Sequence, residues 1–311
     1  MAAVTAAMVK ELREMTGAGM MDCKKALAAT DGDMDKAVEF LREKGLAGAA
    51  KKAGRIAAEG IVAALLTADE KKAVVVEVNA ETDFVAKNEK FQNYVKDVAV
   101  QALASTAADM AGFMAEPWNK DTSLTVEQAL SSQISIIGEN MHIRRYMQME
   151  EENGFVASYI HGGGKIGVLV DVETDVVNDA VKEMAKNVAM QAAALKPLYT
   201  NKDEVDSEYL EKEKEILTQA AKNEKPDAND KIINGMVMGR INKELKEICL
   251  MDQVYVKAED GKQSVSQYVA EIAKANSAKI TVKKFVRFET GEGLEKKEEN
   301  FADEVAKQMG M

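Results

Sequence analysis

The amino-acid sequence predicts an α+β protein with a duplicated core. Three observations support this class: a strand-rich segment occurs twice, three short helical patterns open the chain, and two long amphipathic helices surround a proline turn. The 311 residues are enough for several domains with a sizeable core. We therefore expect an N-terminal bundle, two related antiparallel-sheet halves, an inserted helical hairpin and a C-terminal helix.

Residues 1–55 are predicted to form a three-helix bundle and a linker. Thr5, Asp22 and Asp33 each precede a helical pattern and carry side chains that cap helices. The third helix is expected to end at Gly45, before an Ala/Lys-rich linker that is partly helical. Because a bundle of this size has a thin core, we expect it to pack against something else.

The core is assigned to two halves. The first, residues 56–149, has strands near 60–67 and 72–79 and a helix near 89–105. A short helix follows at Thr125–Ser131, and apolar residues at helical spacing predict another helix over 132–147. The second half, residues 150–200 and 249–290, has strands at 155–160, 166–172 and 280–288.

An internal repeat relates the two halves. Val75–Asp83 resembles Gly167–Asp175, and both segments end in Glu-Thr-Asp. After this point the first copy is two residues longer and contains Phe84, whereas the second continues Val-Val-Asn. Scaffold requirements should be alike in both copies, so the difference between them is the better candidate for function.

Two apolar features have alternative interpretations at this stage. Phe84 either plugs the protein's own core or acts outward on a partner. Met20 and Met21, adjacent on a glycine-flanked turn, either close the bundle or offer an adaptable contact to a partner. Lys24, which follows them, is either part of that contact or an ordinary solvated charge.

Residues 201–248 are predicted to form an antiparallel helical hairpin. Two amphipathic helices flank a break at Pro226. Such an inserted arm is expected to meet another subunit or partner, and the alternative is that it folds onto its own body. Residues 291–311 are assigned to a C-terminal helical module, which either docks in a partner's groove or caps the sheet.

Composition excludes several classes of function. The net charge of −11 argues against nucleic-acid binding, and there is no run of about 18 apolar residues that would span a membrane. The two cysteines and the lack of a targeting pattern favour the cytoplasm. The histidines and cysteines lack metal-ligand spacing, and Gly164-Lys165 precedes a strand rather than a helix. We predict no catalytic residue, metal or cofactor.

Two motifs resemble those of a known family. The first is Lys10-Glu11-Leu12-Arg13 with Thr16–Leu27, and the second is Thr-Asp-Phe-Val-Ala-Lys-Asn at 82–88. Supporting matches occur at Ile137–Asn140, Ile143–Arg145, Arg287–Phe288 and Gly291–Gly293. Essentially the whole chain is similar to the bacterial translation elongation factor Ts family, the guanine nucleotide exchange factors for the GTPase elongation factor Tu.

The resemblance implies a fold and a set of contact residues. The fold has an N-terminal bundle similar to ubiquitin-associated domains, a core of two related halves, a hairpin for dimerisation and a C-terminal helix that reaches across the GTPase. The family's wedge, which disturbs the Mg²⁺ and phosphate-binding loops of the GTPase, matches Asp83 and Phe84, flanked by Thr82 and Val85. The implied docking positions are Arg13, Met20, Met21, Lys24, Ile137 and His161.

Three functions remain open at this point. The first is nucleotide exchange on a translational GTPase, without enzyme chemistry of its own. The second is a non-catalytic adaptor that binds protein surfaces through its N-terminal bundle. The third is an enzyme built around His161. The first is favoured, because Met20-Met21 and the Asp83-Phe84 insertion occur together.

Overall fold

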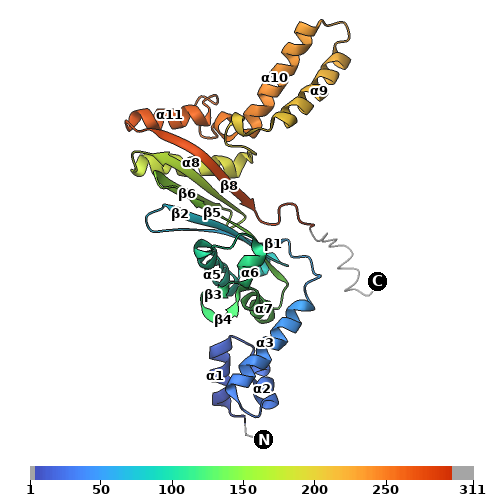
Figure 1. Ribbon diagram of the computed structural model, residues 1–311, viewed down its shortest axis with the longest axis vertical. Coiled ribbons are helices and arrows are strands. Elements are labelled where there is room, and N and C mark those ends of the chain that lie inside the picture. The colour runs from blue at the N-terminus through green and yellow to red at the C-terminus, as the bar shows by residue number, and fades with distance from the viewer. Residues whose placement is uncertain (1–3, 296–311) are drawn as a thin grey trace.

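Figure 1 shows the computed structural model, which describes residues 4–295, as an elongated molecule. The N-terminal bundle lies at one end, a helical hairpin at the other, and two three-stranded antiparallel sheets with their helices lie between them. This is the α+β fold that the sequence predicts. The predicted C-terminal helix falls almost entirely on residues 296–311, outside the described part. No helix of the described residues is long and apolar enough to span a membrane.

The bundle consists of α1 (Ala6–Thr16), α2 (Met20–Ala29) and α3 (Met34–Ala50). The Thr5 and Asp33 side chains accept hydrogen bonds from backbone N–H groups of α1 and α3, as their positions predict. α3 does not end at Gly45, which corrects the predicted boundary. The helix continues through Gly45, which is buried where α3 packs against the first half of the core; a Cβ there would make an ordinary van der Waals contact, 3.9 Å from the Ser131 carbonyl oxygen.

The first half of the core, which we call the N half, contains the sheet β1-β2-β5. Its strands are β1 (Glu59–Leu66), β2 (Lys72–Ala80) and β5 (Met141–Glu150), and its main helices are α5 (Glu89–Ala104) and α7 (Val126–Ile137). Smaller elements are α4 (Asp83–Ala86), α6 (Met110–Ala115), β3 (Pro117–Trp118) and β4 (Asp121–Thr125). Valines of β2 pack against Phe91 and Val95 of α5, which together with α7 covers one face of the sheet.

The second half, the C half, repeats this arrangement in the sheet β6-β7-β8. Its strands are β6 (Gly154–His161), β7 (Ile166–Thr174) and β8 (Ile280–Glu289), and its helices are α8 (Asp179–Leu195) and α11 (Val265–Ala275). The hairpin of α9 (Ser207–Glu224) and α10 (Asp230–Ile248) is inserted between α8 and α11, with short 3₁₀ turns at Lys202–Glu204 and Leu250–Asp252. The hairpin has its own apolar seam, which includes Ala221, Ile233 and Val237.

The predicted helix over 132–147 is wrong. α7 ends at Ile137 because Gly138 adopts a left-handed conformation with φ 92°, and the chain then enters β5. Ile134, Ile137 and Met141 happen to keep helical spacing across this boundary. The main sheet strands and helices of the N half therefore follow the order β1, β2, α5, α7 and β5, which matches β6, β7, α8, α11 and β8 in the C half.

The sheet registers also correct the alignment of the two halves by two residues. Gly60 pairs with Asn79, and the equivalent Gly154 pairs with Glu173. At both glycines a Cβ would collide with a backbone carbonyl oxygen of the neighbouring strand, at 2.2 Å in the N half and 1.9 Å in the C half. Asn79 therefore corresponds to Glu173, although matching the Glu-Thr-Asp letters pairs it with Asp171.

The corrected alignment places an acidic residue and a β-bulge at the same point in each half. The bulge follows Glu77 in β2 and Asp171 in β7. The connection from the second strand to the cap of the next helix then spans residues 81–87 in the N half and 175–177 in the C half. The first connection is thus four residues longer than the second, rather than two.

The two halves pack against each other through the sheet faces that their helices do not cover. Val62, Val75, Val156, Leu169 and Phe288 belong to one buried cluster between them. Backbone hydrogen bonds also cross the interface: the Val62 N–H donates to the Gly164 carbonyl at 2.7 Å, and the Val156 N–H donates to the Glu70 carbonyl at 2.8 Å. The two halves therefore form one continuous core, which supports the loops at its edge.

Candidate functional site

The longer connection of the N half forms one helical turn that presents Phe84. Thr82 caps α4, and its hydroxyl accepts a hydrogen bond from the Val85 N–H at 3.3 Å. Val85 packs against the apolar core, whereas the side chain of Phe84 is 81% exposed. The alternative that Phe84 plugs the protein's own core is therefore wrong. Phe84 is the most exposed of the large apolar residues in the described part of the chain, which makes it a candidate binding residue.

Charged groups surround the base of this turn. Asp83 forms an ion pair with Lys87 at 2.6 Å on the same helical turn. Its hydrogen bond with Lys87 lowers the pKa of Asp83, and the charge of Lys165 contributes in the same direction. Lys165 belongs to the β6–β7 turn, so this turn of the C half lies close to the Phe84 turn of the N half.

Two glutamates join the Phe84 turn to the loop between α7 and β5. Glu139 accepts hydrogen bonds from the backbone N–H groups of Glu81 and Thr82 and from the Thr82 hydroxyl. Glu81 in turn accepts one from the Asn140 N–H. Both acids lie within motifs that the sequence shows. The contact between their loops, 58 positions apart, cannot be seen in the sequence, because only the fold brings the two loops together.

Two of the predicted docking residues lie in this region. Ile137 is half-buried at the end of α7, two residues before Glu139, and packs against the N-half core. His161 is exposed at the end of β6, where its Nδ1 lies 2.9 Å from the Tyr159 hydroxyl. Ile137 therefore lies close to the loop that holds the Phe84 turn, and His161 lies at the start of the β6–β7 turn to which Lys165 belongs.

The other predicted docking residues lie on the N-terminal bundle. Met20 and Met21 are 59% and 61% exposed, so they do not close the bundle. Arg13 and Lys24 are also exposed. These four residues belong to α1 and α2, which lie at the far end of the molecule from the hairpin (Figure 1).

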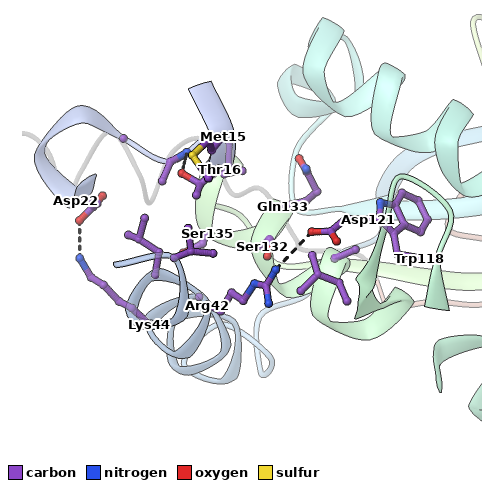
Figure 2. Close-up of a pocket in the computed structure, with 18 of the residues that line it drawn as sticks. Met15, Thr16, Asp22, Arg42, Lys44, Trp118, Asp121, Ser132, Gln133 and Ser135 are labelled. Atoms are coloured by element: carbon purple, nitrogen blue, oxygen red, sulfur yellow. Dashed lines mark hydrogen bonds and ion pairs between the residues drawn. The ribbon is translucent and has the colours of Figure 1, made fainter. Parts of the chain in front are cut away.

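A cavity of about 370 Å³ lies between the bundle and the N half (Figure 2). Its walls include Met15 and Lys44 from the bundle and Trp118 from the N half. Arg42 spans this junction and donates to the Ser123 hydroxyl at 2.9 Å, beside its ion pair with Asp121. The bundle is thus held to the N half by the packing of α3 against α7 and by a few polar contacts. Trp118 is buried beside Tyr94, as expected of a packing residue.

The described residues offer no evident metal site, since no group of three or more His, Cys, Asp or Glu side chains among them could hold an ion. Cys23 and Cys249 are both buried and free. The Phe84 region provides an exposed ring on a turn that is held by hydrogen bonds.

Known proteins show what this chain is similar to. Residues 81–292 match the protein family described as "Elongation factor TS". A protein named "Elongation factor Ts" from Clostridioides difficile (strain 630) is 55% identical over 309 residues, covering 99% of this chain and 100% of that protein. Proteins of the same name from Clostridium novyi (strain NT) and Clostridium tetani (strain Massachusetts / E88) are each 53% identical, covering 98% of this chain and 99% of their own length.

Proposed function

Because the chain belongs to the elongation factor Ts family of translation elongation factors, we propose that it is a guanine nucleotide exchange factor for elongation factor Tu. In this proposal Phe84 enters the GTPase near its Mg²⁺ and phosphate-binding loops, and GDP leaves. The observation that carries the proposal is the 81% exposed ring of Phe84 on a turn anchored by Thr82 and Val85.

The energetics of exchange fit such a wedge. An exchange factor forms no covalent bond, and it must bind the GTPase better without nucleotide than with it. The factor by which it weakens GDP binding equals the factor by which GDP weakens its own binding. Burying one phenylalanine contributes about 2–3 kcal/mol, which corresponds to about a hundredfold in affinity. The remaining differential contact would come from the wider interface.

That interface is proposed to include the docking residues on two separate surfaces. Met20 and Met21, with Arg13 and Lys24 beside them, would form an adaptable apolar pad on the bundle. Ile137 and His161 would contact the partner beside the wedge. We place the protein in the cytoplasm, where translation takes place, and assign it no catalytic chemistry of its own.

The hairpin is proposed to mediate dimerisation. Ile216, Ile232 and Met238 are 62%, 47% and 49% exposed on its two helices, outside its internal seam. Exposed apolar residues on a projecting arm favour association with a second copy. Light scattering should report a dimer for the wild type and a monomer for the Ile216→Asp variant. A monomeric wild type at micromolar concentration would contradict this assignment.

The wedge is tested by the release of fluorescent GDP from elongation factor Tu. We expect Phe84→Ala to slow stimulated release about a hundredfold, with unfolding free energy changed by less than about 0.5 kcal/mol because the ring is exposed. Leu198→Ala, which truncates another exposed apolar side chain (68% exposed), is the matched control and should leave release unchanged.

The same assay separates the adaptor alternative from exchange. An adaptor would bind its partner equally well with and without GDP, whereas reciprocity requires an exchange factor to lose affinity when GDP and Mg²⁺ are added. Wild-type release rates in the Phe84→Ala variant would rule out the wedge.

A further inference from the structure

We propose that Glu139 is a positioning residue that holds the Phe84 turn in its active orientation. This inference rests on the proposed function and adds a residue to it, on a loop 55 positions away from Phe84 in the sequence. Glu139 does not need to touch the GTPase, because it would act through the backbone that carries the ring.

Three hydrogen bonds converge on the Glu139 carboxylate. Oε2 accepts from the backbone N–H groups of Glu81 at 3.1 Å and Thr82 at 3.0 Å. Oε1 accepts from the Thr82 hydroxyl at 2.7 Å. Hydrogen bonds to an ionised acceptor are stronger than neutral ones, and two oxygens bound to consecutive residues also fix orientation.

These contacts fix the residue from which α4 begins. The Thr82 side chain both donates to Glu139 and caps α4, and Phe84 lies two residues further along. The hydroxyl can do both at once because it has one donor and accepts through a lone pair. The orientation of the Phe84 ring is therefore coupled to the Glu139 carboxylate through the Thr82 side chain and through the backbone of Glu81 and Thr82.

The C half shows which of these contacts the fold itself requires. Glu81 accepts a hydrogen bond from the N–H of Asn140, the residue before β5, at 2.5 Å. At the equivalent place Asp175 accepts one from the N–H of Lys279, the residue before β8, at 2.7 Å. This contact occurs in both halves, so we assign it to the scaffold.

The Glu139 contact occurs in the N half alone. Under the strand register, the position of Glu139 corresponds to Ala278 in the C half, which has no side chain able to accept a hydrogen bond. The C half also lacks α4 and an aromatic residue in its shorter connection. The extra carboxylate is thus present where the exposed ring is present and absent where the ring is absent.

The decisive experiment is a double-mutant cycle between Glu139→Ala and Phe84→Ala. GDP release from elongation factor Tu is measured over a range of concentrations of the factor. We expect Glu139→Ala to lower the maximal release rate about tenfold, as befits the loss of a charged hydrogen-bond cluster, and to change the half-saturating concentration less than about twofold. In the Phe84→Ala background the same substitution should cost less than about twofold, because its effect passes through the ring.

Two further variants separate positioning from simple damage. Glu139→Gln should keep release within about threefold of the wild type, since an amide oxygen accepts the backbone N–H groups and its NH₂ donates to the Thr82 hydroxyl. Asp175→Ala removes the scaffold contact of the C half. It should lower the melting temperature without slowing release at the assay temperature.

The outcomes distinguish this inference from the function on which it rests. If Glu139→Ala leaves release unchanged, or slows it equally in both backgrounds, the positioning role is overturned while the wedge stands. If Phe84→Ala releases GDP like the wild type, the wedge and the positioning role both fall. Should Glu139→Ala fail to fold, Glu139→Asp takes its place in the cycle, since the shorter side chain withdraws the carboxylate from the Thr82 hydroxyl but leaves the Thr82 cap of α4 intact, and the same two patterns decide.

Discussion

The N half and the C half of the core follow the same chain path and differ in the connection between their second strand and the next helix. In the C half three residues, 175–177, lead directly to the Asn178 cap of α8. In the N half residues 81–87 form an extra helical turn before the Asn88 cap of α5. The comparison separates scaffold from function within one molecule: shared features build the sheet and its covering helix, and the additional turn carries the exposed ring.

The largest predicted effect concerns a shared feature, the glycine that starts the first strand of each half. A Cβ at Gly154 would lie 1.9 Å from the Val172 carbonyl oxygen, and one at Gly60 would lie 2.2 Å from that of Val78. Either Gly→Ala substitution should lower the free energy of unfolding by about 4 kcal/mol, measured by urea denaturation, because backbone must move to accommodate the methyl group. If only one of the two is damaging, the halves are less alike than their registers indicate.

A second prediction concerns the buried acids at the two β-bulges, where equivalent substitutions should have opposite effects. Glu77 is fully buried between Arg144 and Arg145, at 3.0 and 2.6 Å. Glu77→Gln should lower the free energy of unfolding by about 3 kcal/mol, because it removes the buried anion between the two guanidinium groups and leaves Arg145 only its longer ion pair with Glu292, at 3.4 Å.

Asp171 occupies the equivalent position in the C half but lies next to another buried acid. Burial, reinforced by Glu151, raises the pKa of Asp171 from 3.8 to about 6. Because the pKa of Asp171 is higher in the folded protein than in the unfolded chain, the protonated side chain favours folding. This stabilisation is present in full below about pH 4 and is lost as the pH rises through about 6. Asp171→Asn should therefore stabilise the protein by about 1 kcal/mol at pH 7 and by nothing near pH 4. Destabilisation at pH 7 would show that Asp171 is paired as well as Glu77 is.

The third prediction transfers the short connection to the N half. Replacing residues 81–87 by Asp-Val-Val, the residues of the C half, should leave a folded protein that has lost about 2 kcal/mol of stability, since Val85 and Ala86 no longer pack. GDP release should slow about a hundredfold, as in Phe84→Ala. Circular dichroism checks the fold, and retained exchange activity would place the functional contact elsewhere.

The smallest effect is expected for the exposed apolar residue of the short connection. Val177 is 50% exposed, and the C half presents no ring there. Val177→Ala should leave the rate of GDP release unchanged. It should change the free energy of unfolding by less than about 0.5 kcal/mol. A measurable loss of exchange would mean that the C half takes part in the same contact and that the division between the halves is wrong.

The same comparison explains what the sequence could predict. The β-branched runs revealed the strands because continuous apolar residues reflect burial on both faces of a strand. The repeat was detectable, but its alignment followed the letters Glu-Thr-Asp. Two physical constraints fix the alignment: a glycine beside a carbonyl group and an acid at a bulge. Both depend on strands that pair across the sheet, so they leave no local pattern in the sequence.

Boundaries that depend on distant contacts were also the ones predicted wrongly. Gly45 reads as a helix end but lies inside α3, buried where that helix packs against α7. α11 covers a stretch for which the sequence analysis predicts no element. At the candidate site, Phe84 and its neighbours follow from the motif, whereas Glu139 becomes visible only when the two loops meet.

The outward orientation of Phe84 in the unbound protein has a kinetic consequence. A binding group that must first leave a pocket delays each encounter by the time needed for that opening. This ring requires no such step, so no rearrangement of this chain slows a productive collision beyond diffusion and orientation. Under the proposed function, this chain does not have to rearrange before it binds a partner. The lifetime of the complex is then set by its dissociation rate.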